Sequence, residues 1–408
     1  MAVDNQDQEI NKLLNALGFE KSVCHIRQNM VAALELTKNA CLDSEFSCIY
    51  TGSLAEGFSG NYYSKISRAD FDIMFIFNRF PYIVDEDKTQ DDAPNNFQLV
   101  ARVCHNSVRQ GYAKLELITV KVPSKLHLAV KFEDRLFLSG LKTLSSLMRI
   151  NRKLLGFIRE EEVLGGVQFE RHGPASSVTI ESKEEGYAKR DLVYGHRCQF
   201  WPKCAQNWIT RRRNWPENAD VINAAKLGCH LVPTGFPGSK TEELEWRYSF
   251  VKPERHIMWF FNDCQRKCFA LLKILNKENL ASHFDTEVLT SYHFKTTLLW
   301  VLEETDDPDW SDKDLLKHVK TCLVKLMTFI KSRHCPHYFI EHANLFDREI
   351  FKDETCGKLS KILDSVLEDP YTALRSCPTF QTLINDFRFP SSMSLEFSVV
   401  LDVLPTVR

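Results

Sequence analysis

Two carboxylates two positions apart follow a glycine–serine pair, and these residue types at this spacing are suited to phosphate chemistry. Asp70 and Asp72 stand at the start of one apolar run, and Gly52 and Ser53 follow the preceding apolar run. If the second run is a strand, residues i and i+2 share a face, so the two carboxylates would be neighbours. Neighbouring carboxylate anions repel each other, and a divalent cation such as Mg²⁺, which prefers carboxylates together with phosphate oxygens, relieves that repulsion.

The glycine–serine pair supplies the second half of this chemistry. Glycine lets the backbone approach a ligand closely, and the exposed N–H groups, together with the Ser53 hydroxyl, can hold a phosphate. A phosphate-holding turn beside a metal-holding pair indicates metal-assisted phosphoryl or nucleotidyl transfer. Either signal alone is also typical of an ordinary turn or an exposed strand end. The hypothesis therefore depends on both signals occurring in this order beside strand-forming runs.

Length and composition are those of a globular protein with room for two lobes. The chain has 408 residues, of which 44% are hydrophobic and 26% charged. The formal net charge is −2, so there is no global basic excess, and any nucleic-acid surface must be a local patch.

Cysteine usage and the N-terminal sequence favour a cytoplasmic protein. The 13 cysteines are scattered, the N-terminal residues are acidic and polar, and no apolar run reaches the length of a membrane span. We therefore expect reduced thiols, a cytoplasmic location and no membrane partner. The histidine and cysteine groupings match no zinc-ligand spacing, so we expect no structural zinc.

Apolar spacing predicts the elements that must position these residues. The patterns predict one long helix or two abutting helices over 5–40, strands at 48–50, 72–77 and within 98–122, a helix over 134–163, a hairpin within 178–194, and helices over 252–277, 285–304, 311–332 and 355–368. A sheet-rich N-terminal half before a helical C-terminal half predicts two lobes with a cleft between them.

Three further features have two interpretations each. Lys21, Arg27 and Lys38 lie on polar positions of the first helix, where they form a solvated face or meet a phosphate backbone. Asp191, on an otherwise apolar strand, faces water at an edge or joins the first two carboxylates. The segment 198–216 is rich in tryptophan and arginine, which favours a tryptophan-anchored connector over a nucleic-acid surface.

Several ordered segments resemble the Mab-21 family, which includes cyclic GMP-AMP synthase and the cGAS-like receptors of animals. The resemblance spans about residues 45 to 350. Besides the glycine–serine turn and the paired aspartates, the matching segments are HGPASSVTI at 172–180, RDLVYGHRCQFWPKCAQNW at 190–208, GCHLVP at 228–233, EWRYSF at 245–250, CQRKCFALLK at 264–273, SYHFKTTLLW at 291–300 and CPHYFIEHANLF at 335–346.

The resemblance implies an α+β, two-lobed nucleotidyltransferase fold with an N-terminal spine helix, a mixed β-sheet core and a helical C-terminal lobe. We expect the core lobe with its spine helix at 1–250 and the helical lobe at 251–408. By the same resemblance, Gly52 and Ser53 form the turn that holds the donor triphosphate. Asp70, Asp72 and Asp191 form a catalytic triad that binds two Mg²⁺ or Mn²⁺ ions.

Four more residues take nucleotide-binding roles by resemblance. Lys273 is similar to a lysine that contacts the triphosphate, and Ser291 to its hydroxyl neighbour. Tyr292 is similar to an aromatic residue that stacks on a nucleobase, which suits a planar amphipathic ring. Arg247 is similar to a guanidinium that contacts a base or a phosphate. For Arg247 and Tyr292, a buried structural role is the alternative.

The implied activity is metal-dependent synthesis of a cyclic dinucleotide, such as cyclic GMP-AMP, from ATP and GTP when a ligand is sensed in innate immune signalling. One departure bears on the ligand: Val251 to Asp263 is too short for the zinc-binding insertion of cyclic GMP-AMP synthase. We therefore expect double-stranded RNA, which is recognised largely by shape and backbone, ahead of double-stranded DNA, with homodimer formation on that ligand.

Two other functions compete with this one. The first is a catalytically inactive Mab-21 protein that acts as a nucleotide- or protein-binding scaffold in development. The second is a processive RNA nucleotidyltransferase such as a terminal uridylyltransferase, which the EWRYSF and SYHFK segments disfavour. Loss of a triad aspartate would favour the scaffold, and none of the three is lost.

Overall fold

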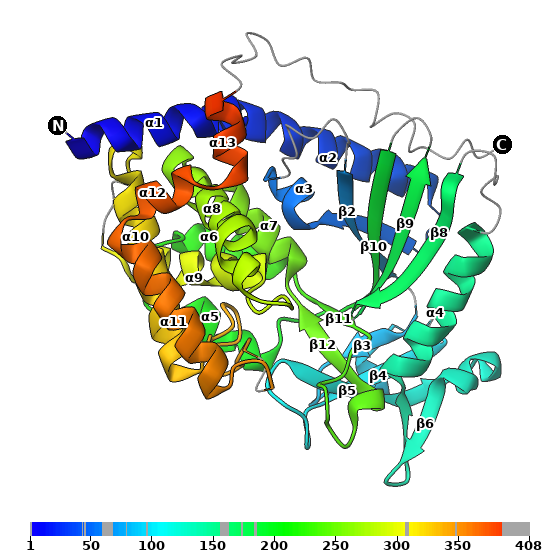
Figure 1. The fold of residues 1–408 in the computed structure, drawn as a ribbon. Helices are drawn as coiled ribbons and strands as arrows, with labels where there is room; N and C mark the ends of the chain where they lie inside the picture. Colours follow the sequence, from blue (N-terminus) through cyan, green and yellow to red (C-terminus); the bar gives the residue numbers. More distant parts are fainter. Residues whose placement is uncertain are drawn as a thin grey trace.

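The computed structural model describes residues 2–42, 44, 46–58, 68–78, 80–94, 97–155, 163–172, 174–182, 186–306, 310–346 and 349–385. Helices α1 (Ala2–Ala16) and α2 (Lys21–Cys41) run end to end along one edge of the molecule (Figure 1). The sheet lies under α2 and the C-terminal helices lie under α1. The mixed α+β fold, with a sheet-rich first half and a helical second half, confirms the predicted fold class. No helix in the described part is both long and apolar enough to cross a bilayer.

One mixed sheet forms the first half. Its main path follows the order β1-β2-β10-β11-β12-β5-β4-β3, while β9 pairs with β10 and β8, and β7 pairs with β5 and β6. The strands are β1 Phe46–Thr51, β2 Arg68–Phe77, β3 Tyr82–Val84, β4 Leu99–Cys104, β5 Tyr112–Val120, β6 Ala129–Phe132, β7 Arg135–Leu138, β8 Val163–His172, β9 Ala175–Ser182, β10 Gly186–Arg197, β11 His230–Val232 and β12 Glu245–Ser249.

Helices fill the second half and cover parts of the sheet. After α1 and α2 they are α3 Gly52–Glu56, α4 Gly140–Leu155, α5 Gln206–Thr210, α6 Asn218–Lys226, α7 Val251–Trp259, α8 Asp263–Leu275, α9 Ser291–Glu304, α10 Leu315–Ser332, α11 Asp353–Glu368, α12 Pro370–Arg375 and α13 Pro378–Asn385. Figure 1 shows α8 to α12 packed together on the side of the molecule away from β8 and β9.

The break between α1 and α2 falls at Gly18, whose φ of 75° is in the left-handed region that glycine adopts without strain. Two abutting helices are thus the outcome, as one of the predicted alternatives. On the α1 side, the Asp7 carboxylate accepts a hydrogen bond from the backbone N–H of Leu316 at 2.8 Å. On the α2 side, Asn39 pairs with both backbone groups of Cys48 at 2.7 and 2.9 Å. The helix pair therefore ties the two halves together.

Three predicted helix boundaries are wrong, and a specific local interaction explains the first two. The helix predicted from residue 134 begins at Gly140, since Arg135–Leu138 pairs with both β5 and β6. The helix predicted over 252–277 is two helices, because the Asn262 side chain accepts the Gln265 N–H at 2.9 Å and starts α8 anew. The helix predicted from residue 285 begins at Ser291.

The basic residues predicted on the polar face of the first helix mostly turn inward. Arg27 is buried, and its guanidinium donates to the Gly57 carbonyl at 3.4 Å. Lys38 is half-buried, with its ammonium 5.1 Å from the centre of the Phe75 ring, and burial lowers its pKa. Long side chains of this kind cover apolar surface with their stems. Only Lys21 of the three is exposed, so they do not form a row that could meet a phosphate backbone.

The tryptophan- and arginine-rich segment is a structural connector, as predicted. Trp208 is fully buried, and the Arg211 guanidinium pairs with the Glu303 carboxylate at 2.5 and 2.9 Å. The same guanidinium lies 4.1 Å from the centre of the Trp300 ring. These contacts anchor the segment to α9.

Candidate active site

The glycine–serine turn lies directly against the Asp72 carboxylate. Strands β1 and β2 are antiparallel, with Thr51 opposite Asp72, and β1 runs straight into α3. Gly52 has a φ of 67°, and a Cβ built on it would overlap the Asp72 carboxylate. Only glycine accommodates both this backbone conformation and this approach. The turn, which follows β1, and Asp72 of the next strand in the sequence, β2, are thus in direct contact in the fold.

The third predicted carboxylate lies level with the second. Strands β2 and β10 are parallel, and Asp191 stands in register with Asp72. Paired residues of neighbouring strands share a face of the sheet, so both aspartates belong to the face of the glycine–serine turn. The Ser177 hydroxyl on β9 donates to the Asp191 carboxylate and orients it. Asp70 lies two residues before Asp72 on β2, and its side chain lies outside the described part of the structure.

Ser53 and Lys273 meet from opposite halves of the chain. Ser53 is on α3 and Lys273 is near the end of α8, and the ammonium donates to the hydroxyl at 2.6 Å. Burial lowers the pKa of Lys273 to about 8, against the opposing effect of the Glu56 carboxylate. A phosphate placed beside this ammonium would favour its charged form.

Helices α2 and α7 hold α3 from behind. The Gln28 side chain donates to the Glu56 carbonyl at 3.1 Å, and the Trp259 indole donates to the Ala55 carbonyl at 3.0 Å. The helix ends at Gly57, whose φ of 87° is again left-handed. The position of the turn is therefore fixed by side chains of two other elements.

A cavity of about 580 Å³ lies next to the turn, a volume within the usual range of small-molecule sites. It is lined from the sheet half by the turn, β2 and β12, and from the helical half by α7, α9 and the segment near residue 340. The lining residues are Thr51, Gly52, Glu56, Asp72, Arg247, Tyr248, Ser249, Phe250, Val251, Glu254, Arg255, Thr290, Tyr292, His293, Lys295, His337 and Leu345. The predicted cleft between the lobes is thus a cavity lined by both.

The other predicted nucleotide-binding residues differ in how they meet this cavity. Arg247 is exposed on β12, opposite Tyr112 of β5, where burial raises the pKa of Tyr112 and the charge of Arg247 opposes that effect. Tyr292 lines the cavity, while its hydroxyl is engaged in the wall. Ser291 is exposed at the start of α9, next to the lining residue Thr290. Ser53 and Lys273 are not among the lining residues, but Ser53 follows the lining residue Gly52 and binds Lys273.

A buried ionic group that sequence reasoning missed forms one wall. The Lys295 ammonium lies 2.5 Å from the Glu56 carboxylate and 3.5 Å from the Glu254 carboxylate. Burial opposes the charge on Lys295, but the two carboxylates outweigh it and raise the pKa of Lys295. Burial also raises the pKa of Glu254, against the effect of Lys295. Helix α9 carries other polar and charged residues besides Lys295, so its sequence gave no signal for these buried partners.

A neutral polar chain continues from Glu254. The Tyr292 hydroxyl donates to the Glu254 carboxylate at 2.8 Å and lies 3.1 Å from Nε2 of His337. Burial and the neighbouring carboxylate raise the pKa of Tyr292, so the phenol keeps its proton. His337 belongs to the segment 335–346, and the sequence held no signal for this contact.

The carboxylates fit a divalent metal by their chemistry. Asp72 and Asp191 provide hard oxygen donors on one face of the sheet, beside a turn that can hold phosphate. Among the described side chains no group of three His, Cys, Asp or Glu residues is arranged to hold an ion. The predicted third ligand, Asp70, is outside that set. The donor set is typical of Mg²⁺ or Mn²⁺ rather than of zinc.

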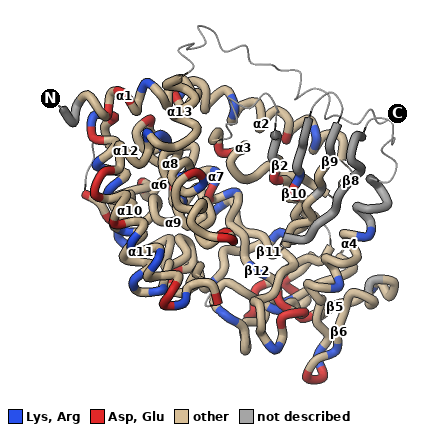
Figure 2. The backbone as a smooth tube through the Cα atoms, in the orientation of Figure 1, with Lys and Arg blue, Asp and Glu red and all other residues tan. Residues whose placement is uncertain are grey.

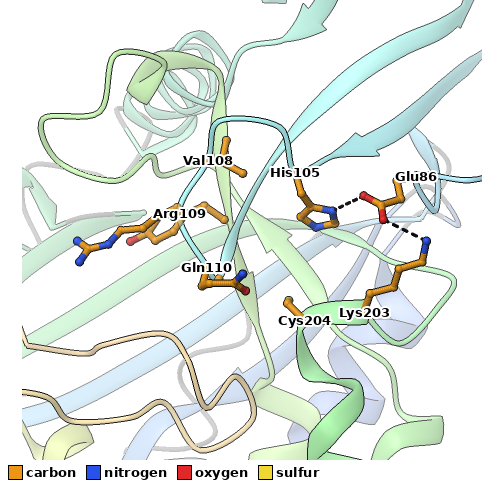
Figure 3. Close-up of a pocket in the computed structure, with 9 residues that line it drawn as sticks. Glu86, His105, Val108, Arg109, Gln110, Lys203 and Cys204 are labelled. Atoms are coloured by element: carbon orange, nitrogen blue, oxygen red, sulfur yellow. Dashed lines mark hydrogen bonds and ion pairs between the residues drawn. The ribbon is translucent and has the colours of Figure 1, made fainter.

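A second cavity, of about 320 Å³, is lined by Glu86, His105, Arg109, Lys203 and Cys204 among others (Figure 3). Three of its polar groups bind one another, since Glu86 bonds His105 at 2.8 Å and Lys203 at 3.1 Å. Burial raises the pKa of the Cys204 thiol to about 12, so a thiolate nucleophile is not available there.

Charges on the surface are mixed. Figure 2 shows Lys and Arg interspersed with Asp and Glu along the helical half. Helix α2 lies wholly within the described residues, and Lys21 is its only exposed Lys or Arg. Its exposed face includes the apolar residues Ile26 and Leu36, which are 44% and 73% exposed.

Two family models match the chain. Residues 70–259 match the Mab-21 protein nucleotidyltransferase domain, and residues 264–365 match the Mab-21 protein HhH/H2TH-like domain. The first stretch contains Asp70, Asp72, Asp191 and Arg247. The second contains Lys273, Ser291 and Tyr292.

Proposed function

The chain belongs to the Mab-21 family, and on that premise we propose that it is a cGAS-like nucleotidyltransferase that makes a cyclic dinucleotide from ATP and GTP. The observation that carries this proposal is the contact between Gly52 and the Asp72 carboxylate, with Asp191 in register beside it. A phosphate held at the turn would lie next to the carboxylates. That proximity is what nucleotidyl transfer requires.

The donor nucleotide would be held at both ends. Ser53 and Lys273, already bonded to each other, would bind the triphosphate through a hydroxyl and an ammonium. Tyr292 would stack on a base, and the Arg247 guanidinium would donate to a base or phosphate oxygen. The cavity is lined by both Gly52 and Tyr292, which supports this assignment of a phosphate end and a base end.

Asp70, Asp72 and Asp191 would hold two Mg²⁺ or Mn²⁺ ions. Such ions, when bound, lower the pKa of an attacking ribose hydroxyl and stabilise the departing pyrophosphate. Within the protein, the Ser177 hydroxyl keeps the Asp191 carboxylate in one orientation. Asp191 would assist removal of the hydroxyl proton, and closing the ring would take a second transfer.

We propose double-stranded RNA as the activator, ahead of double-stranded DNA. Only Phe260, Phe261 and Asn262 separate α7 from α8, which leaves no room for a zinc-binding insertion. The exposed face of α2 offers a single basic residue, so an RNA duplex would need basic residues of other elements. RNA dependence is therefore tested separately from catalysis.

The decisive experiment is a product assay. Purified protein is incubated with the four radiolabelled NTPs and Mg²⁺ or Mn²⁺, alone, with double-stranded RNA, or with double-stranded DNA. Asp72→Asn and Asp191→Asn are compared with Asp364→Asn, an exposed aspartate of α11. We expect a phosphatase-resistant dinucleotide from wild type and Asp364→Asn only. Nucleotide binding without product under every condition would replace this proposal with the non-catalytic scaffold.

A further inference from the structure

The protonation state of His337 follows from its partners. The backbone N–H groups of Phe339 and Ile340 both point to its Nδ1, at 3.1 and 3.2 Å. A backbone N–H only donates, so Nδ1 is an acceptor and carries no hydrogen. Burial, with the nearby Arg247 and Arg211 guanidinium groups, lowers the pKa of His337 to about 3. The ring is therefore neutral, with its one hydrogen on Nε2.

This hydrogen sets the direction of the next two bonds. The Nε2–H of His337 donates to the Tyr292 oxygen at 3.1 Å. The Tyr292 proton is then directed to the Glu254 carboxylate, 2.8 Å away. Glu254 in turn is held by Lys295. The turn at 337–340 thus determines the direction of every hydrogen bond up to the ionic group of the wall.

We infer that His337 is a positioning residue that holds the Tyr292 ring in place to receive a nucleobase. The inference rests on the proposed function of Tyr292 and adds a residue to which no role had been assigned. Tyr292 is the second residue of α9, and its hydroxyl end is held from two other segments by Glu254 and His337. An aromatic side chain that is already fixed loses little further conformational entropy when the ligand binds, so less of the binding free energy is lost to ordering it.

Two substitutions test the acceptor role of Nδ1 and the donor role of Nε2 separately. In side-chain length, the amide oxygen of asparagine corresponds to Nδ1, and the amide nitrogen of glutamine corresponds to Nε2. His337→Asn therefore keeps the acceptor for Phe339 and Ile340 but cannot reach Tyr292. His337→Gln keeps a donor that reaches Tyr292. If His337 acts only by accepting the two backbone bonds, nucleotide binding should be retained in His337→Asn. If it positions Tyr292, nucleotide binding should weaken in His337→Asn and be retained in His337→Gln.

The experiment measures equilibrium binding of ATP, GTP and inorganic tripolyphosphate, with Mg²⁺, together with thermal unfolding. Losing the donor to Tyr292 is expected to weaken nucleotide binding by about 3- to 10-fold in His337→Asn. Tripolyphosphate binding should not change, because it uses Ser53 and Lys273. His337→Gln should stay within about 3-fold of wild type for nucleotides, on the same scale.

The outcomes distinguish failure of the positioning role of His337 from failure of the proposed function. Wild-type nucleotide affinity in His337→Asn, or an equal loss of nucleotide and tripolyphosphate, would overturn the positioning role alone. Equal losses in the two variants would do the same. If wild-type protein binds neither ATP nor GTP, the proposed function fails, and the inference fails with it.

Discussion

The ammonium of Lys273 donates a 2.6 Å hydrogen bond to the hydroxyl of Ser53, across 220 positions of the chain. One partner belongs to the helix that follows β1, and the other belongs to α8 in the helical half. The proposed triphosphate site is thus shared between the two halves. Any movement of one half relative to the other would change it directly.

Lys273 predicts a specific pH dependence of triphosphate binding. Its pKa is lowered by burial to about 8, so below that pH the ammonium is charged and binds phosphate, and above it the charge is lost. We expect affinity for tripolyphosphate to fall as pH rises through 8, by at most about tenfold per pH unit for one proton. Lys273→Arg keeps its charge over this range and should remove the fall. Equilibrium binding between pH 6.5 and 9.5 checks this, and a flat wild-type profile would contradict it.

Gly52→Ala is predicted to damage the site and the fold together. The new methyl group would overlap the Asp72 carboxylate, and φ at this position is 67°. Strain of this kind costs about 1–3 kcal/mol, and displacement of Asp72 should abolish metal-dependent product formation. Denaturant unfolding and the product assay measure the two effects.

Gly238→Ala provides the matched control. Gly238 has a similar φ of 76°, but a Cβ there meets no atom within 4 Å. It should therefore show the backbone cost alone, about 1–2 kcal/mol, and keep full activity. Equal effects of the two substitutions on activity would mean that contact with Asp72 is not what requires glycine at position 52.

The two described carboxylates of the site differ in how far the sequence alone could predict their position. The turn and Asp72 are neighbours because they flank two strands that pair directly, and the apolar runs made those strands predictable. Asp191 needed a resemblance, since its register with Asp72 comes from a parallel pairing more than 100 residues along the chain. The pattern alone could not distinguish it from an aspartate at a strand edge.

The ionic wall, formed by Lys295, Glu56 and Glu254, was not predictable from the sequence for a different reason. Glu56 and Lys295 are 239 positions apart, and each looks like an ordinary helix residue within its own segment. Their pairing depends on how α3 packs against α9. The opposite error affected Arg27 and Lys38, whose helical positions indicated solvent. Arg27 instead donates to the Gly57 carbonyl at the end of α3, and Lys38 lies over the Phe75 ring of β2. Charge and spacing predict an amphipathic helix, but not how wide its buried face is.

The ionic wall is predicted to be costly to break. Lys295→Met would leave the Glu56 and Glu254 carboxylates without their shared cation in a buried setting. Removing one partner of a buried pair typically costs about 3–5 kcal/mol. Lys325→Met removes a surface pair with Glu304 at 2.6 Å and should cost less than about 1 kcal/mol. Urea unfolding of both variants gives the comparison, and similar free energies of unfolding would show that the wall does not stabilise the fold.

Ser177→Ala tests whether the orientation of Asp191 matters for turnover. The Ser177 hydroxyl donates to the Asp191 carboxylate, and a hydrogen bond to a charged group contributes about 1.5–3 kcal/mol. If that orientation is needed in the transition state, turnover should fall by about tenfold or more. The metal concentration for half-maximal activity should rise as well, because the Asp191 carboxylate, a proposed metal ligand, would no longer be held in one orientation.

The adjacent serine separates this effect from packing. Ser176 is fully buried, and among the described residues its hydroxyl has no hydrogen-bond partner. It precedes Ser177 on β9, so its side chain belongs to the opposite face of the sheet. Ser176→Ala should leave turnover and metal dependence unchanged. If instead both serine variants lose activity equally, the hydroxyl of Ser177 acts through the packing of β9 rather than through Asp191.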